Sequence, residues 1–180
     1  MPKIEPILQK LDSSRRHLLS AADAVCSEHW QTPPSQGRWC AAQLVAHLAL
    51  VERFILRKAD QLTQGFPSAR PFFARLHVPF AIVERGWFPR KSPARVTPGE
   101  IAAGKEDMLA DLREARERTL AFLDETKGRD LSGYCWPHPF LGTLSVYDWL
   151  RFIASHEIRH TKQMREIAVS LPKSVANLRN

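Results

Sequence analysis

The chain has 180 residues, 44% of them hydrophobic and 25% charged, a composition typical of a globular protein with one core. No stretch approaches the roughly 18 apolar residues of a membrane span, and the first residues lack the apolar run of a signal peptide. Cys26, Cys40 and Cys135 have no C-x-x-C spacing, which favours reduced thiols. We therefore expect one domain over residues 1–180, in the cytoplasm and without membrane contact.

The formal net charge of +7 raises the question of nucleic-acid binding. Lysines and arginines are spread along the chain, however, with only a loose cluster at Arg85, Arg90, Lys91 and Arg95. No stacking motif or recognised DNA-binding pattern accompanies them. We interpret the basic residues as a solvated surface and expect no nucleic-acid partner.

Apolar periodicity predicts a first amphipathic helix over about residues 3–29. Prolines and a glycine in residues 30–37 then break the helical pattern. A second helix is predicted from about Cys40 to Gln64, with Gln43 at the capping-box position and Cys40 as a weak cap. Its interior face comprises Leu44, His47, Leu48, Val51, Ile55, Ala59 and Leu62.

Residues 65–98 differ in kind, because they hold six of the 13 prolines together with many aromatic residues. The prolines exclude one long helix, although residues 69–85 could form a short one. So long a connection inside a compact domain is usually functional. Its apolar content also exceeds what a loop needs, so we expect a homodimer that involves it or nearby helix faces.

A third helix is predicted to begin at Thr97-Pro98-Gly99-Glu100 and to end near Lys127, before Gly128. Ser145, with Asp148 three residues later, predicts the start of the last helix. No window shows strand alternation. We therefore predict an all-α four-helix bundle of up-down-down-up type, with the Pro- and aromatic-rich segment as the crossover between helices two and three.

The last helix carries two histidines on its apolar face, which comprises Leu150, Ile153, His156, His160, Met164, Ile167 and Leu171. His156 and His160 are four residues apart, so their rings can aim at one point. His47 lies on the interior face of another helix. Three imidazoles suit Zn²⁺ or Ni²⁺ and leave an open position for water or substrate. The alternative is that each is a core histidine hydrogen-bonded to a neighbour.

His156-Glu157-x-x-His160 also matches the H-E-x-x-H pattern of zinc proteases, in which Glu157 would be the general base. That interpretation needs a third ligand downstream, and Glu166 lies too far along the same helix. It also needs a sheet, for which the sequence gives no sign. We disfavour it, and expect Glu157 to be a polar residue at the edge of the apolar face, hydrogen-bonding a ligand histidine.

Two blocks of sequence resemble the DinB/YfiT-like superfamily. The first is Trp39-x-x-x-x-Leu44-x-x-His47-Leu48, and the second runs from His138-Pro139-Phe140-x-Gly142 through Trp149-Leu150-x-Phe152 to His156-x-x-Arg159-His160-x-x-Gln163. The resemblance covers essentially the whole chain, and the middle segment is not part of the shared pattern. It implies a four-helix bundle whose metal ligands are His47, His156 and His160. Cys40 and Asp148 depart from the usual Ser or Thr and Glu.

The resemblance implies an enzyme that acts on a small-molecule substrate at the open metal position, either a transferase or isomerase using a low-molecular-weight thiol or a hydrolase. Glu157 or His138 are the candidates for proton transfer in such a site. Arg85, Arg90 and Lys91 are candidates for binding an anionic cosubstrate. The rival hypothesis is a non-enzymatic metal- or ligand-binding bundle, related to stress, with a closed site.

Overall fold

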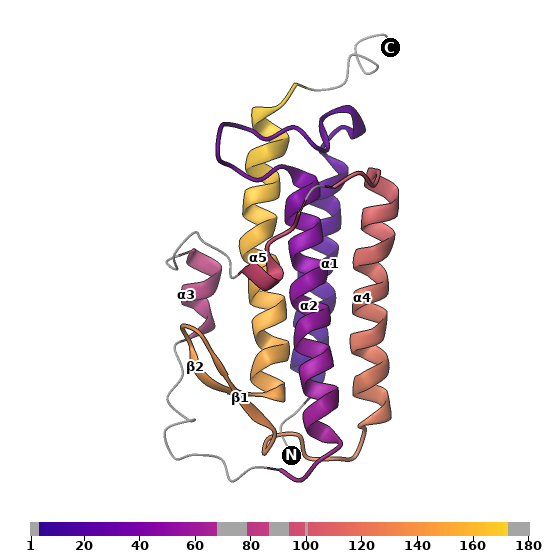
Figure 1. Ribbon diagram of the computed structural model, residues 1–180, viewed down its shortest axis with the longest axis vertical. Helices are drawn as coiled ribbons and strands as arrows, with labels where there is room; N and C mark the ends of the chain where they lie inside the picture. The colour runs from indigo at the N-terminus through magenta and orange to yellow at the C-terminus, as the bar shows by residue number, and fades with distance from the viewer. Residues whose placement is uncertain (1–3, 68–78, 87–93, 100, 173–180) are drawn as a thin grey trace.

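The computed structural model describes residues 4–67, 79–86, 94–99 and 101–172. Four long helices form a bundle, which confirms the predicted fold class (Figure 1): α1 (Glu5–Asp23), α2 (Ala41–Thr63), α4 (Lys105–Glu125) and α5 (Val146–Ser170). The described residues also form a short helix, two 3₁₀ turns and two strands: α3 (Phe80–Arg85), η1 (Ser27–His29), η3 (Ala94–Val96), β1 (Cys135–His138) and β2 (Gly142–Ser145).

The long helices run up, down, down and up in chain order (Figure 1). The parallel helices α1 and α5 pack together, as do α2 and α4, and α2 also packs on α5. Because α2 and α4 run in the same direction, the chain between them must travel the length of the bundle. Its described parts are α3 and η3, whereas residues 68–78 and 87–93 lie outside the described residues. The course of the Pro-rich crossover and a helix before Phe80 therefore stay predictions.

Two helix starts follow from local hydrogen bonding and were predicted correctly. At α5, the Asp148 amide donates to Ser145 Oγ at 3.2 Å, and the Ser145 amide donates to Asp148 Oδ2 at 3.3 Å. At α2, the Cys40 amide donates to Gln43 Oε1 at 3.1 Å. Both pairs satisfy backbone groups that a helix end leaves unpaired. They fix where the two helices that carry the histidines begin.

The predicted third-helix start at Thr97 is wrong, because α4 begins at Lys105. Val96 is buried against α2 in η3, from which the chain climbs to the far end of the bundle (Figure 1). An extended residue covers about 3.3 Å and a helical one 1.5 Å, so the non-helical residues 101–104 help to cover this distance. Lys105 Nζ then donates to the Val25 carbonyl at 2.8 Å, just after α1, which ends at Asp23 rather than near His29.

A two-stranded hairpin, which the sequence did not predict, precedes α5. Strands β1 and β2 pair antiparallel with His138 opposite Gly142, and Gly142 has a φ of 83° in the turn. A three-residue loop followed by a left-handed glycine is a common hairpin connection. Four-residue strands are too short to show alternation, and this hairpin depends on packing: the rings of Trp136 and Trp149 stack with centroids 4.9 Å apart.

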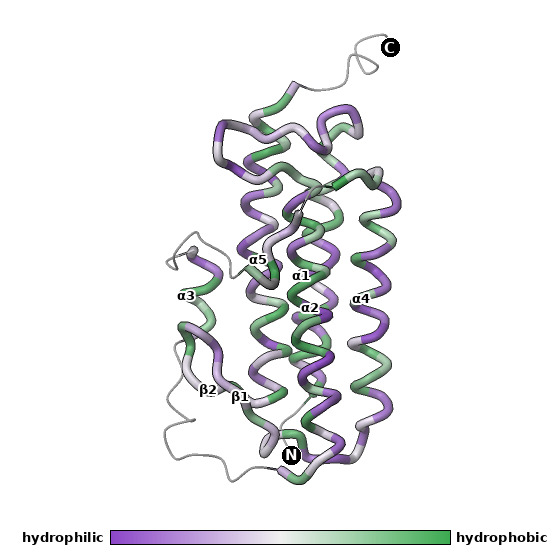
Figure 2. The backbone as a smooth tube through the Cα atoms, in the orientation of Figure 1, coloured by the Kyte–Doolittle hydropathy of each residue, from purple (hydrophilic) through white to green (hydrophobic). Residues whose placement is uncertain are grey.

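The interior also contains charges. Apolar and polar stretches alternate along each helix (Figure 2), yet each long helix contributes one buried charged residue to a single cluster. We call the cluster of Arg15, Glu52, Arg116 and Glu157 the four-helix charge network. Its ion pairs are Arg15–Glu157 at 2.6 Å, Arg15–Glu52 at 2.8 Å, Arg116–Glu52 at 2.7 Å and Arg116–Glu157 at 3.1 Å. Two cations and two anions make it neutral.

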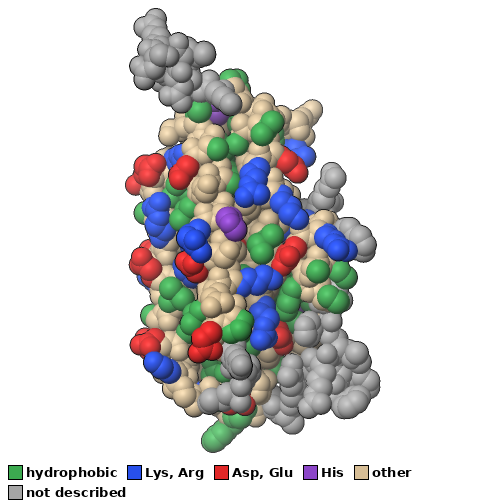
Figure 3. All heavy atoms as spheres, turned by 180° about the vertical axis from the view of Figure 1, so that it is seen from behind, with side chains coloured by type: hydrophobic (Ala, Val, Ile, Leu, Met, Phe, Trp, Pro, Cys, Tyr) green, Lys and Arg blue, Asp and Glu red, His purple; other side chains and the backbone are tan. Residues whose placement is uncertain are grey.

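The surface shows no single-sign face in the view from behind, where acidic and basic side chains alternate (Figure 3). Of the candidate residues for an anionic cosubstrate, Arg85 is exposed, whereas Arg90 and Lys91 lie outside the described residues. The homodimer stays a prediction. Within the described part of the chain, no helix is long and apolar enough to cross a membrane.

Candidate metal centre

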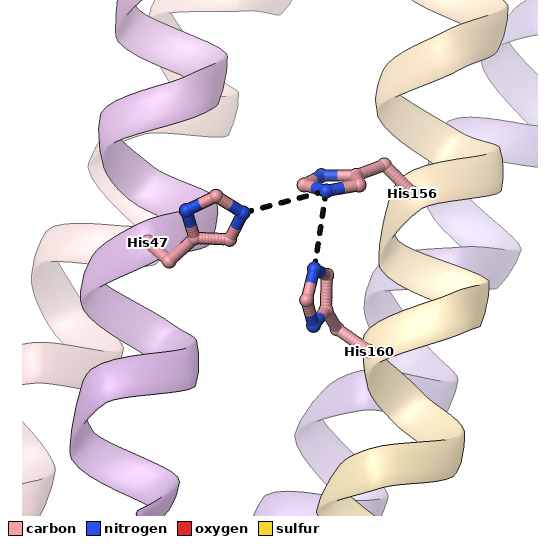
Figure 4. Close-up of side chains that lie close together, drawn as sticks. All are labelled: His47, His156 and His160. Carbon is pink, nitrogen blue, oxygen red and sulfur yellow. Dashed lines mark hydrogen bonds between the residues drawn. The ribbon is translucent and has the colours of Figure 1, made fainter. Parts of the chain in front are cut away.

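Three histidines from two helices converge on one point between α2 and α5 (Figure 4). His47 Nε2 lies 3.4 Å from His156 Nε2, across 109 positions of sequence. His160 Nε2 lies 3.1 Å from the same nitrogen, one helical turn along α5. His47 and His160 are buried and His156 is half-buried. The structure therefore brings together the three residues that the sequence singled out as metal ligands.

Hydrogen bonds on the far side of two rings orient these nitrogens. His47 Nδ1 lies 2.7 Å from the Val96 carbonyl oxygen, and His160 Nδ1 lies 2.6 Å from Gln163 Oε1. Both partners are acceptors, so each Nδ1 carries the proton and donates it. Each Nε2 is then left with a lone pair aimed at the shared point. Such a partner behind the ring is the usual arrangement of metal-bound histidines.

The spacing of the nitrogens fits a metal ion better than a hydrogen-bonded cluster. Two Nε2 atoms whose lone pairs face each other repel unless a cation lies between them. A Zn²⁺ ion held tetrahedrally at about 2.0–2.1 Å from each nitrogen separates any two of them by about 3.3 Å. The two direct separations are 3.4 and 3.1 Å, and all the ligand atoms lie within 4.8 Å of one another. The donor set therefore fits one divalent ion.

Burial keeps the three rings neutral. It lowers the pKa of His160 to about 3, with the His47 ring and the Arg159 cation adding to the effect. Burial, His160 and His47 together hold the pKa of His156 well below its usual value. Burial likewise lowers the pKa of His47, although its hydrogen bond to Val96 opposes this. Neutral imidazole is the form that binds metal, so no proton has to leave at neutral pH.

The convergence point opens onto a cavity of about 500 Å³. Its lining changes character along α5. Before the histidines the wall is aromatic, with Trp149 and Phe152, and after His156 it includes the polar side chains of Arg159 and Gln163. A cavity of this volume is in the range that holds a small organic ligand.

The sequence profile of the DinB superfamily matches residues 10–164 of this chain. The chain belongs to the DinB superfamily. It is 25% identical over 141 residues to the uncharacterized protein YuaE of Bacillus subtilis (strain 168), a match that covers 78% of this chain and 84% of YuaE.

Two solved structures have a similar fold. One is TT2238, described as a four-helix bundle protein, with a TM-score of 0.58, 22% identity and coverage of 91% of this chain and 99% of TT2238. The other is YfiT from Bacillus subtilis, with a TM-score of 0.58, 21% identity and coverage of 92% of this chain and 85% of YfiT. YfiT is described as a probable metal-dependent hydrolase with an unusual four-helix bundle topology. At these identities the likeness shows the four-helix bundle fold alone.

His138, a candidate for proton transfer in this DinB-superfamily protein, lines the cavity beyond the Phe152 ring. Its Nδ1 accepts hydrogen bonds from the Phe140 and Leu141 amides at 3.1 and 3.2 Å. Burial lowers its pKa to about 4, so at neutral pH its single proton must be on Nε2. His138 is therefore placed to donate a hydrogen bond from Nε2, and Nδ1 is not available as a base.

Glu157, the other candidate for proton transfer, belongs to the four-helix charge network. Ser14 Oγ and the Arg15 and Arg116 guanidinium groups donate to its carboxylate. The expected hydrogen bond to a ligand histidine is not among its contacts, because Val96 and Gln163 fill that role. Because these donors hold its carboxylate, Glu157 is not available as the general base that the zinc-protease interpretation requires.

Sequence reasoning placed Arg159 and Gln163 in the DinB-like pattern as supporting or structural residues rather than ligands, and it missed Val96. Gln163 follows His160 by three positions and so lies on the same face of α5, a spacing that indicates which ligand it supports. Arg159 follows His156 by three in the same way; it lines the cavity, where burial lowers its pKa. The Val96 carbonyl left no signal, because a backbone acceptor on a distant turn depends on the tertiary fold alone.

Proposed function

We propose that this protein is a metal-dependent enzyme that acts on a small molecule. A divalent ion, Zn²⁺ or Ni²⁺, is held by His47, His156 and His160. The observation that carries the proposal is the convergence of three Nε2 lone pairs at the wall of a 500 Å³ cavity. Three protein ligands leave a coordination position free, as catalytic sites do and closed structural sites do not.

The ion supplies a Lewis acid that lowers the pKa of a water or a thiol at its free position. Hydrolysis and thiol-dependent transfer or isomerisation are therefore the candidate reactions. The description of YfiT as a probable metal-dependent hydrolase supports the first, and the superfamily resemblance supports the second with a low-molecular-weight thiol as cosubstrate.

The protein's own groups orient the substrate. His138, with its proton on Nε2, is placed to donate a hydrogen bond to a substrate oxygen from the cavity wall. Its ring packs on Phe152 with centroids 4.7 Å apart, and Phe152 stacks in turn on His156 at 5.1 Å. These ring contacts fix the position of His138 relative to the metal centre. Glu157, whose carboxylate is held by Ser14, Arg15 and Arg116, has no part in the proposal.

Metal content is the first test. Protein purified without an affinity tag should contain about one divalent ion per chain by elemental analysis. A His156→Ala, His160→Ala double variant should lose it, because one ligand remains. His17→Ala, which removes an exposed histidine of α1, is the matched control and should keep the ion. Full occupancy in the double variant contradicts the assignment.

Turnover separates an enzyme from a metal-binding bundle. The cavity at the histidines favours an enzyme over the rival hypothesis of a closed, non-enzymatic site. Metal-reconstituted protein is assayed against a panel of electrophiles with several cellular thiols and with water alone, and His47→Ala is the inactive control. Absence of turnover with every combination, while the metal stays bound, favours the non-enzymatic bundle.

A further inference from the structure

Arg159 is a cation in the metal cavity that has no anionic partner among the described residues. It lies three positions after His156 and one before His160, half-buried at the cavity wall. Neither an ion pair nor a hydrogen bond joins its guanidinium to any side chain in the described part of the protein. A half-buried charge without a partner costs free energy, so its presence in a ligand cavity needs an explanation.

The carboxylates of the cavity wall are already paired with cations. Arg38 Nη2 lies 2.6 Å from Glu166 Oε2. Glu84 accepts from Lys10 Nζ at 2.7 Å, and its backbone carbonyl accepts from Lys162 Nζ at 2.9 Å. Among the described residues, therefore, both carboxylates that line the cavity have cationic partners. Lys162 keeps its charge but is exposed to solvent, so Arg159 is the half-buried cation left without an anion, and a divalent ion on the histidines would add two more positive charges.

The opposite end of the cavity is apolar. Phe152 and Trp149 lie on α5 before the histidines, and Phe54 and Val83 face the same space from α2 and α3. Phe152 and Arg159 are seven residues apart on α5, or about 10 Å along the helix axis. His156 lies between them. A ligand of that length could place one end on the aromatic wall and the other at the guanidinium, with its middle at the metal centre.

We propose that Arg159 binds an oxyanion group, a carboxylate or a phosphate, of a small substrate whose apolar body lies on the aromatic wall. This deepens the proposed function and rests on it for the position of the reacting bond. A guanidinium presents two parallel N–H donors that match the oxygens of either group. The anion compensates the unpaired charge, and the aromatic wall sets the direction in which the substrate lies across the histidines.

The test compares an anionic ligand with its neutral amide and with a second anion of matched spacer length. Zinc-loaded protein is titrated by calorimetry with 4-phenylbutyrate, with its neutral amide 4-phenylbutyramide and with 3-phenylpropyl phosphate, which has the same three-carbon spacer. An acid should bind at least about tenfold more tightly than the amide, as expected for a charge-assisted bidentate pair. Arg159→Gln should reduce that preference by a similar factor, and Arg159→Lys should keep part of it. Arg165→Gln, an exposed position on the same helix outside the cavity lining, is the matched control.

The two phenyl anions identify the head group: tighter binding of 4-phenylbutyrate assigns a carboxylic acid, and tighter binding of 3-phenylpropyl phosphate assigns a phosphate ester. Equal affinities for acid and amide overturn the proposal, as does an undiminished preference in Arg159→Gln. Zinc content is measured on every sample. Loss of zinc from wild type would count against the proposed function alone, because the metal-free protein still tests the charge preference at Arg159.

Discussion

Arg15 Nε lies 2.6 Å from Glu157 Oε1 in the middle of the bundle and joins α1 to the helix that carries two metal-ligand candidates. Glu157 is the residue immediately after His156, and its second carboxylate oxygen pairs with Arg116 Nη2 at 3.1 Å. Removing a buried charge leaves its partners uncompensated, so all four residues of the network depend on one another. The network therefore holds α5 in one rotation relative to the other helices, with the histidines facing the cavity.

Glu157→Gln should lower the free energy of unfolding by about 3 kcal/mol, because it leaves two buried guanidinium groups with one carboxylate. Urea denaturation followed by circular dichroism measures this. The matched control is Asp12→Asn, whose partner Arg16 lies at the surface one turn along α1, and it should cost less than about 1 kcal/mol. Similar losses of unfolding free energy in the two variants would contradict this role of the four-helix charge network.

Gln163→Leu should weaken zinc binding about 10- to 100-fold, because it removes the acceptor that holds the His160 ring. Competition with a chromophoric chelator gives the affinity. Gln163→Glu keeps an acceptor oxygen and should bind zinc at least as tightly as wild type. If Gln163→Leu also binds like wild type, then Gln163 does not orient the ligand.

His138 should titrate near pH 4, because burial lowers its pKa from the usual 6.5. Both the folded and the unfolded chain are neutral at this position above pH 6.5. Between pH 6.5 and 4 only the unfolded chain takes up the proton, so stability falls as the pH falls. The stability of His138→Gln should fall less steeply over this interval. NMR of the ring gives the pKa directly, and a value near 6.5 would refute the prediction.

Cys40→Ser should raise the free energy of unfolding by about 0.5 kcal/mol, because a hydroxyl caps a helix N-terminus better than a thiol does. The change leaves Gln43 and its hydrogen bond to the Cys40 amide in place. Cys26→Ser, before the short turn η1, is the control for a cysteine-to-serine change elsewhere. A less stable Cys40→Ser protein would show that burial of the thiol matters more than the cap.

Local signals account for what could be predicted from the sequence. The apolar periodicity located the bundle, the Ser145 and Asp148 pair placed the start of α5, and the four-residue spacing of His156 and His160 placed both on one face. Each of these signals lies within a few residues of chain. The Thr97 start failed because its local signal was overridden by the distance that the chain has to cover before α4.

The four-helix charge network could not be predicted from such local signals. Arg15 and Glu157 are 142 positions apart, and a charged residue on a helix is ordinarily interpreted as solvent-exposed. Glu157 was accordingly placed at the edge of the apolar face. Glu157 can be buried because two guanidinium groups from other helices pair with it in the folded protein, and no local sequence pattern indicates such pairing.

The ligand set has a thermodynamic consequence, because His47 and His156 are brought together across 109 positions by the native fold. The unfolded chain does not hold the three rings at one point, so an ion that binds them binds the native state alone. By mass action, free metal at 1,000 times its dissociation constant then adds about 4 kcal/mol to the free energy of unfolding. The melting temperature of this protein should rise with zinc concentration and fall when a chelator is added.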